Sequence, residues 1–477
     1  MRIDRLAIIG SMYGVLLAGW AYAQATDNPN DLRQPTSVQR TAFDDNYVSF
    51  AEANANNGPS ESPSNLPSPK AEKPATKTEK PEAKEENKEE GKKEEESKED
   101  EGDKPWTLPQ PRFLKCRDIT LGGWTEIGTT FNNWGTNYNG LVTYPDRSDQ
   151  LLLDQQWLFL DKPIKNDGCG WAWGGHVDLM YGSDAFVMEA VGLETSWNQH
   201  DYYQVAIPQF YLDVAYNDLT MRIGHFMTIL GYEVCQAPQN FFYTHAYTHQ
   251  YGEPFTHTGM LFMYKVNDQL SVSAGFHRSD DQFGPSYSLS APDREVDHLG
   301  FLGGIKWVGP EKKLELAWSL STSEKLEFGA SQWISSLVAT YHVSDKFKYV
   351  FQSDYGQVAN SYQVDGVHAN WYGINQYFLY EINKCWSAGL RAEWFSDREG
   401  VRVTGVRPDN PDFGQVFPGE FYEISLGLNW KPHANFTLRP EIRYDWYDPR
   451  DDVQFFPFDN GNRSHQWLFG MDAIVTY

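Results

Sequence analysis

The chain has 477 residues, with 65 acidic and 40 basic side chains and a net charge of −25. This negative balance argues against a nucleic acid partner, which binds basic surfaces. Beyond the first 23 residues, no apolar run reaches the roughly 18 residues that a membrane-spanning helix needs. If the chain crosses a membrane, it must do so as a closed β-barrel, because only helices and closed barrels satisfy their backbone polar groups in lipid.

Two N-terminal segments are expected to lie outside the folded domain. Residues 1–23 have the features of a signal peptide: two arginines, an apolar run and an Ala-Tyr-Ala cleavage site. Residues 24–105 are rich in Lys, Glu, Pro and Asn, so they bury too little apolar surface to offset the entropy of ordering, and we expect disorder. In an exported protein this segment would be a periplasmic tail, either a solvated spacer or a tether that contacts the cell wall.

Residues 113–477 are predicted to form an all-β domain, a transmembrane antiparallel β-barrel. Successive side chains of a strand point to opposite faces, and this region contains sixteen segments in which apolar residues alternate with polar or small ones. The second segment is the least regular, because three consecutive leucines interrupt its alternation. The segments are 118–131, 150–161, 169–181, 203–215, 219–229, 257–266, 269–279, 297–308, 313–323, 331–343, 346–356, 370–382, 385–396, 419–431, 434–446 and 465–477.

The final segment, 465–477, shows the alternation most clearly. Its aromatic and aliphatic residues, from Trp467 to Tyr477, share one face, and mostly polar or small residues share the other. About ten residues of tilted strand cross the hydrocarbon core of a bilayer. We therefore expect this strand to close the barrel by pairing with the first strand near 121–131.

The connections between the segments alternate in length. They are short and rich in turn-forming residues after even strands, as at Asn217-Asp218, and mostly long after odd strands, as at 230–256 and 397–418. An even strand count with this alternation is typical of outer-membrane barrels, which have short periplasmic turns, long external loops and both termini in the periplasm.

Charged residues occupy the face opposite the apolar one. Segments 385–396, 419–431 and 434–446 carry acidic or basic residues at alternate positions. At membrane depth a charge is tolerated only where it faces water, so these patterns predict a wet, charged lumen. The predicted pore-lining residues are Arg222, Arg391, Glu393, Glu423, Arg439, Glu441, Arg443, Asp445 and Asp472.

Four short motifs resemble the putative β-barrel porin 2 (OmpL-like) family. They are Gly224-His225-Phe226, Gly231-Tyr232-Glu233, Asn240-Phe241-Phe242-Tyr243-Thr244-His245-Ala246-Tyr247 and Pro254-Phe255-Thr256-His257-Thr258-Gly259. The resemblance extends more loosely over about 116–477. It implies a porin-type outer-membrane channel, and it supplies no established catalytic or binding residue.

The connection after the fifth strand, 230–256, is the candidate constriction. In general porins this loop folds into the lumen, and by analogy we expect the same here. Its acidic and histidine side chains would then face lumenal arginines, and opposed charges across a constriction select solutes. The alternative is an external loop packed on its neighbours through aromatic side chains. The candidate residues are Glu233, Tyr243, His245, His249 and Glu253.

Histidines and cysteines offer weaker signals. His245 and His249 are four residues apart, but an HxxxH spacing in a tyrosine-rich loop is a weak indication of zinc, so we expect neither a metal nor another cofactor. In an exported protein the four cysteines allow three pairings. We expect at most one disulfide, between Cys116 and Cys169, because Cys235 lies at the opposite end of the predicted topology.

These patterns together predict a sixteen-stranded porin, not an enzyme, that lets small hydrophilic solutes or ions diffuse through the outer membrane. Barrels of this size leave aqueous space, and many assemble as homotrimers. Residues 106–477 carry a charge of about −18, which favours a mild cation preference, while the inward arginines argue the other way. The alternatives are a receptor or adhesin that uses the long loops, and a barrel enzyme, although no serine lies in a nucleophile-elbow sequence.

Overall fold

A computed structural model of the chain describes residues 105–166, 168–198, 201–284, 286–287, 295–296, 299–325, 330–361, 367–451 and 453–477. The predicted signal peptide and, apart from Pro105, the predicted tail lie outside these residues.

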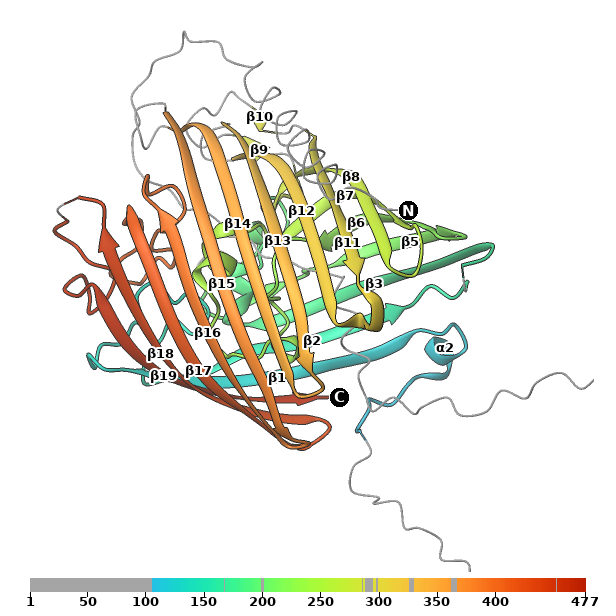
Figure 1. Cartoon of the computed structure of the whole chain (residues 1–477), viewed down its shortest axis with the longest axis horizontal. Coiled ribbons are helices and arrows are strands. Elements are labelled where there is room, and N and C mark those ends of the chain that lie inside the picture. Colours follow the sequence, from blue (N-terminus) through green and yellow to red (C-terminus); the bar gives the residue numbers. More distant parts are fainter. Residues whose placement is uncertain are drawn as a thin grey trace, which may run out of the picture.

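The described residues form one closed antiparallel barrel (Figure 1). Its sheet contains seventeen strands, but β4 (Gln204–Ala206) and β5 (Phe210–Tyr216) pair with successive parts of β3 (Trp171–Gly182), so the two make one interrupted strand and the barrel has sixteen. The others are β1 (Thr120–Asn132), β2 (Leu151–Lys162), β6 (Leu219–Met227), β7 (Thr256–Lys265), β8 (Leu270–Asp280), β11 (Gly300–Val308), β12 (Leu314–Lys325), β13 (Ala330–Ser344), β14 (Phe347–Ser361), β15 (Val367–Asn383), β16 (Trp386–Asp397), β17 (Gly419–His433), β18 (Phe436–Pro449) and β19 (His465–Thr476).

Each of the sixteen predicted segments coincides with one of these strands, counting β4 and β5 together. The closure is also confirmed, because β19 pairs with β1 from Trp124 opposite Thr476 to Asn132 opposite Leu468. Beyond the last paired residues, Gly123 and Tyr477 exchange two backbone hydrogen bonds of 2.9 Å. The alternation therefore specified both the strands and the face that each presents.

Little regular structure lies outside the barrel strands. A four-residue helix, α2 (Arg112–Lys115), precedes β1, and two short strands, β9 (Ser286–Tyr287) and β10 (Glu295–Val296), pair antiparallel with each other. Short 3₁₀ turns occupy Asp184–Val187, Glu194–Ser196, Ala237–Gln239 and Pro310–Lys312, and a π-helical turn occupies Thr248–Gly252. Within the described part of the chain, no helix has both the length and the apolar character needed to cross a membrane.

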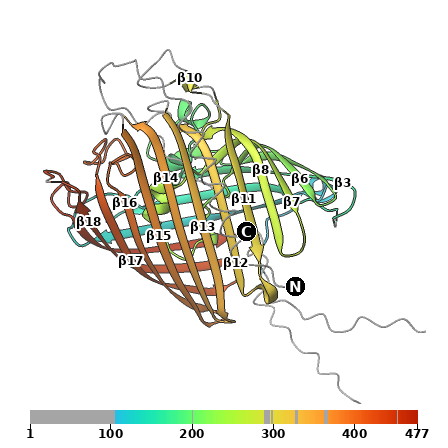
Figure 2. The same cartoon turned by 45° about the horizontal axis from the view of Figure 1, so that its top comes forward.

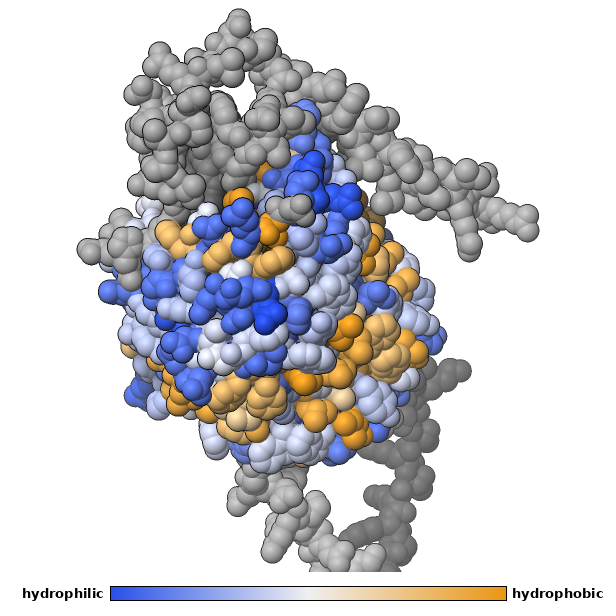
Figure 3. Space-filling view, turned by 90° about the vertical axis from the view of Figure 1, so that its left-hand side faces the viewer, coloured by the Kyte–Doolittle hydropathy of each residue, from blue (hydrophilic) through white to orange (hydrophobic). Residues whose placement is uncertain are grey.

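The outer face of the barrel is apolar. On β17, Ile424, Leu426 and Leu428 are 41–51% exposed, whereas Glu423 and Ser425 between them are fully buried. In Figure 3, hydrophobic side chains form a band across the lower part of the view, below a more hydrophilic region. An outward apolar band with inward polar residues is the arrangement that lipid requires of a barrel.

The two ends of the barrel differ in their connections. One end has short turns, such as 217–218, 345–346 and 434–435, whereas the other carries the long loops (Figure 2). Exposed aromatic residues, including Trp171 and Trp386, lie at the short-turn end, where a periplasmic interface would place them.

Loops fill the interior at the long-loop end. Inward residues of the strands, such as Trp371, Phe395 and Phe421, join an apolar cluster with Leu230 and with Phe417 from the loop after β16. The interior at this level is therefore packed with side chains.

None of the four cysteines forms a disulfide. The expected bridge between Cys116 and Cys169 is wrong: both thiols are free and exposed. Cys235 is buried, and its sulfur lies 3.8 Å from the Tyr144 hydroxyl. Sharing the short-turn end of the barrel was not enough to bring two cysteines together.

Candidate functional site

The connection between β6 and β7, residues 228–255, lies inside the barrel, and we call it the inward loop. Of its residues only Gln239 is exposed. The loop connects β6 to β7, which are neighbours in the barrel, and it contacts β16 and β18, which lie on the opposite side of the strand order. It therefore crosses the lumen from one wall to the other.

Two lumenal carboxylates accept hydrogen bonds from the inward loop. The backbone nitrogens of Tyr243 and Thr244 donate to Glu441 at 2.9 and 3.0 Å, and the Thr244 hydroxyl donates at 2.5 Å. Glu393 receives the same set from the backbone nitrogens of Tyr247 and Thr248 and from the Thr248 hydroxyl, each at 2.6 Å. An irregular loop lacks ladder partners, so these carboxylates satisfy donors that would otherwise be buried without one.

Three lumenal arginines bind the carbonyl groups of the same loop. Arg439 Nη1 donates to the carbonyls of residues 237, 240 and 242 at 2.9–3.0 Å. Arg391 donates to the Thr244 carbonyl at 2.6 Å, and Arg443 donates to that of His245 at 2.5 Å. The wall thus offers acceptors to the loop's N–H groups and donors to its C=O groups.

The same arginines are neutralised by carboxylates. Arg391 pairs with Glu423 at 2.9 Å and with Glu233 of the loop at 2.8 Å. Arg443 pairs with Asp445 at 2.7 Å. Each guanidinium therefore bridges an acidic wall and the loop.

Glu126 on β1 is a lumenal residue that the sequence analysis missed. Its carboxylate receives a hydrogen bond of 2.8 Å from Arg439, which also pairs with Asp472 at 2.7 Å. Glu126 alternates with apolar residues on β1, and that signal could have identified it.

The structure places all nine predicted pore-lining residues on the inner wall, and each is at most 5% exposed. Eight of them either bind the inward loop directly or form an ion pair with an arginine that binds it, as described above. The guanidinium of Arg222 pairs with Asp213 on β5 through two bonds of 2.9 Å. That Arg222 faces the acidic residues of the loop stays a prediction. The residues under the loop form a buried, ion-paired layer.

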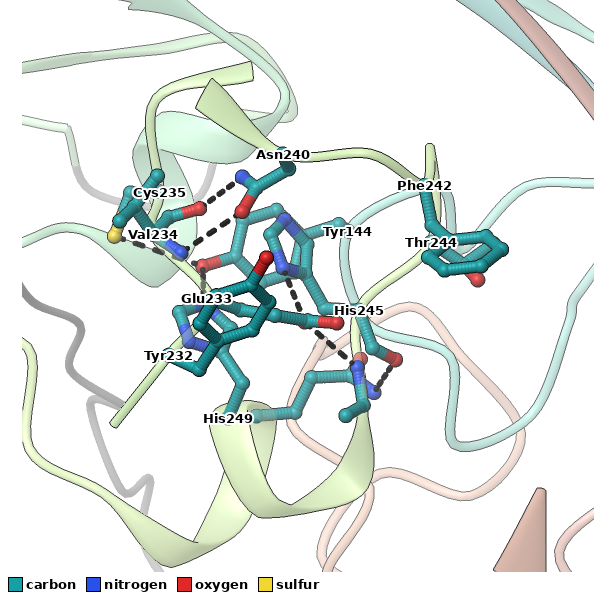
Figure 4. A network of polar contacts seen from close by, with 12 residues as sticks. Tyr144, Tyr232, Glu233, Val234, Cys235, Asn240, Phe242, Thr244, His245 and His249 are labelled. Atoms are coloured by element: carbon teal, nitrogen blue, oxygen red, sulfur yellow. Dashed lines mark hydrogen bonds and ion pairs between the residues drawn. The ribbon is translucent and has the colours of Figure 1, made fainter. Parts of the chain in front are cut away.

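A second network links residues of the inward loop to Tyr144 in the loop after β1 (Figure 4). His245 Nδ1 and Glu233 Oε2 are hydrogen-bonded at 3.0 Å, and His249 Nε2 is hydrogen-bonded to the Tyr144 hydroxyl at 3.1 Å. Burial opposes the negative charge of Glu233, but Arg391 and His245 together hold its pKa well below the ordinary value. Burial lowers the pKa of both His245 and His249 to about 4. At neutral pH the network is an ionised glutamate between an arginine and neutral histidines.

The remaining two loop candidates also contact the wall. The Tyr243 hydroxyl donates to Asp154 at 3.0 Å, and Glu253 accepts a hydrogen bond from Gln352. Next to Glu253, the carbonyl of Gly252 accepts a hydrogen bond of 2.9 Å from the Trp371 indole. Burial raises the pKa of Glu253 to about 8.

Glycines in the wall make room for the loop. A β-carbon at Gly373 would lie 2.2 Å from the Thr248 hydroxyl oxygen, one at Gly128 would lie 2.2 Å from the Tyr243 hydroxyl, and one at Gly389 would lie 2.3 Å from the Phe241 ring. A contact under 3 Å forces an atom to move. The wall and the loop are therefore matched in shape as well as in charge.

External loops cover the inward loop from the other side. The Tyr251 hydroxyl donates to the carbonyl of Leu141 at 2.9 Å, and Arg402 lies over the ring of Trp371, 4.8 Å from its centre. Arg407 donates to the carbonyl of Ser183 at 2.7 Å. Loops after β1, β3 and β16 thus meet above the lumen.

This architecture matches a known family. The family described as Putative beta-barrel porin-2, OmpL-like matches residues 118–477. The chain belongs to this porin family. Its membership supports an outer-membrane channel, which confirms the class of function and the location expected from the sequence.

Solved porins share the barrel at low sequence identity. The anion-selective porin of Comamonas acidovorans is 10% identical, over 75% of this chain and 99% of that one, with a TM-score of 0.50, and this likeness shows the fold. The outer-membrane channel DcaP of Acinetobacter baumannii is 12% identical over 75% and 97%, with a TM-score of 0.49. OmpT of Vibrio cholerae in its trimer form is 12% identical over 75% and 99%, with a TM-score of 0.47. No curated protein matches the chain.

Proposed function

We propose that this porin passes small hydrophilic solutes or ions by passive diffusion and that the inward loop, 228–255, is its constriction. The observation that carries the proposal is the span of the loop from β6 to the opposite wall, where Glu393, Glu441 and the arginines hold its backbone. A loop that crosses the lumen at this level limits what can pass. Family and fold favour this channel over an enzyme.

Planar-bilayer recording of the purified full-length protein tests the proposal. We expect discrete conductance steps, with a larger unit conductance when the inward loop, 228–255, is replaced by a short turn. A protein that folds but gives no steps would contradict the channel. Steps of unchanged size after loop replacement would show that the loop does not set the constriction.

Point variants can detach the loop from the wall without removing it from the chain. In the Glu393→Gln/Glu441→Gln double variant the loop loses its charged acceptors, so we expect conductance to become larger or to fluctuate. Glu420→Gln is the control, because Glu420 bonds Trp394 and Arg398 near the rim instead of the loop. Its conductance should match that of the unaltered protein.

We also propose that the porin assembles as a homotrimer within outer-membrane lipid, as the trimer form of Vibrio cholerae OmpT indicates for that protein. The mass of the protein in detergent, corrected for bound detergent by light scattering, tests this. A mass of a single chain would contradict it.

A further inference from the structure

A second histidine cluster lies on the inner wall, beside the first residue of the inward loop, Thr228. His257 on β7 and His277 on β8 approach each other with their Nδ1 atoms 3.1 Å apart. Asp280 Oδ1 lies 3.5 Å from His257 Nδ1, and one ligand atom from each of the three residues falls within 4.8 Å of the others. Both histidines are fully buried, and the Asp280 side chain is 7% exposed.

A local irregularity of the two strands creates this cluster. Gly259 lies opposite His277, but His257 lies opposite Asp280, so β8 has one more residue than β7 in this interval. In a regular strand, residues three apart such as 277 and 280 point to opposite faces. The bulge turns both side chains to the same side, as bulges do when they re-aim a residue.

We propose that His257, His277 and Asp280 bind a divalent transition-metal ion of the zinc type. Two imidazoles and one carboxylate are a common zinc ligand set, with the fourth position left to water. Bonds of about 2.0–2.1 Å in a tetrahedral site separate the ligand atoms by about 3.3–3.4 Å. The observed separations of 3.1 and 3.5 Å lie on either side of this value, so the site needs little rearrangement.

The Nε2 atoms of the two histidines, which face away from the proposed ion, already have hydrogen-bond partners. His257 Nε2 is hydrogen-bonded to the Thr228 hydroxyl at 2.5 Å, and His277 Nε2 to the Ser321 hydroxyl at 3.2 Å. Ser321 also donates to Asp280 at 2.8 Å. Metal-bound histidines usually donate their second N–H to such a partner, which fixes the ring and its tautomer.

The proton positions are consistent with metal binding. Without a metal, one Nδ1 must carry a proton to bridge the two histidines. If His257 carries it, His277 Nε2 donates to Ser321, and Ser321 donates to Asp280. On binding, the proton of His257 moves to Nε2 and is donated to Thr228, so both Nδ1 lone pairs face the ion and the protein releases no net proton when both rings are neutral.

The other cluster of potential ligands, Glu233, His245 and His249, is a weaker candidate. Glu233 is paired with Arg391 at 2.8 Å, and a guanidinium repels a cation. The rings of His245 and His249 are stacked 4.4 Å apart with an interplanar angle of 23°, so their in-plane lone pairs do not converge on one point. The rings of His257 and His277 instead meet edge to face at 75°.

The test uses the folded full-length protein in detergent, without a histidine tag. After incubation with ZnCl₂ and removal of free metal, we expect one zinc per chain by elemental analysis. His277→Gln and Asp280→Asn should lose this zinc. His225→Gln is the matched control, because His225 is also fully buried, lies on the neighbouring strand β6 and bonds Thr258 instead of the cluster. It should retain the zinc.

A milder variant avoids the risk that loss of a ligand prevents folding. Ser321→Ala removes only an outer hydrogen-bond partner, and such changes lower metal affinity by about 10- to 100-fold. Isothermal titration should show that weakening, with the stoichiometry unchanged. The proposal is overturned if the unaltered protein binds no zinc, or if the bound zinc is indifferent to Ser321→Ala and persists without His277.

Discussion

At the scale of single residues, the charges on the inner wall act as partners for a loop backbone. Glu441 accepts three hydrogen bonds from the inward loop, and Arg439 reaches three of its carbonyl groups. Buried peptide groups must be paired, and an irregular segment inside a barrel finds no ladder. Alternating charges on β16 and β18 therefore hold the inward loop in place.

Removing one of these charges should be costly. Arg391→Met leaves Glu233 and Glu423 buried without their guanidinium. Breaking a buried ion pair in this way costs about 3–5 kcal/mol of unfolding free energy. Urea unfolding followed by tryptophan fluorescence measures the loss. Arg398→Met is the control: this arginine is 67% exposed, so water screens its pair with Glu420 and the variant should lose far less stability. Equal losses for the two variants would contradict the argument.

The seating of the loop should depend on pH through Glu253. Burial raises its pKa to about 8, against 4.5 when it is solvated. When the loop is bound to the wall, Glu253 stays protonated up to about pH 8, whereas in a released loop it would ionise above about pH 4.5. The loop is therefore bound most strongly below about pH 4.5, and its binding weakens as the pH rises from there through about 8. We expect conductance to rise as the pH is raised from 6 to 9.

The substitution Glu253→Gln isolates this effect. Glutamine keeps the shape of the protonated acid and does not ionise, so the rise in conductance between pH 6 and pH 9 should disappear. A rise that persists in the variant would assign the pH dependence to another group.

At the scale of elements, the inward loop and the wall are complementary in volume. Gly373 on β15 faces Thr248, whose short branched side chain cannot swing away from an added β-carbon. Gly373→Val should displace the loop and raise the unit conductance. Ala392→Val, on the outer face of β16, also creates a valine but adds its bulk toward lipid, and it should leave conductance unchanged. No change in either variant would show that the close contact at Gly373 does not position the loop.

The strands could be predicted from the sequence, but their internal contacts could not. Because successive side chains of a strand alternate, the sequence assigns each residue to one of the two faces of the sheet. This is why β19 and its pairing with β1 were predictable. The role of Glu393 as an acceptor for the Tyr247 and Thr248 backbone was not, since it depends on where a distant loop settles. The sequence predicted opposed side-chain charges, whereas the wall mainly binds main-chain groups.

The His257 cluster escaped prediction for a related reason. His277 and Asp280 are three residues apart, so simple alternation assigns them to opposite faces, and only the bulge in β8 unites them. Glycine offers a usable signal: those in mid-strand on the charged face, such as Gly389 and Gly427, lie where a loop approaches closely.

At the scale of the whole molecule, the barrel is apolar outside and charged within, and its lumen changes along its length. At the long-loop end, Trp371 and Phe421 are fully buried. Toward the short-turn end, lumenal Lys306 and Glu315 form an ion pair of 3.2 Å and are 13% and 19% exposed. Solvent therefore reaches the inner wall more readily on this side of the loop.

This gradient bears on ion selectivity. The buried charges under the loop are held in pairs, so charges that meet water are better placed to act on passing ions, together with the net field of the chain. Residues 106–477 carry about −18, and carboxylates outnumber arginines around the loop. We expect a mild preference for cations, seen as a reversal potential of cation-selective sign under a KCl gradient across a planar bilayer.

Two single variants make the argument specific to the lumen. Glu315→Gln removes a negative charge beside Lys306 and should shift the reversal potential toward anions, whereas Lys306→Gln removes a positive charge and should shift it toward cations. Raising the ionic strength should shrink both shifts, because salt screens charges that meet water. An anion-selective parent protein would refute the preference. Shifts of the same sign in both variants would place the controlling charges elsewhere, in the paired layer under the inward loop.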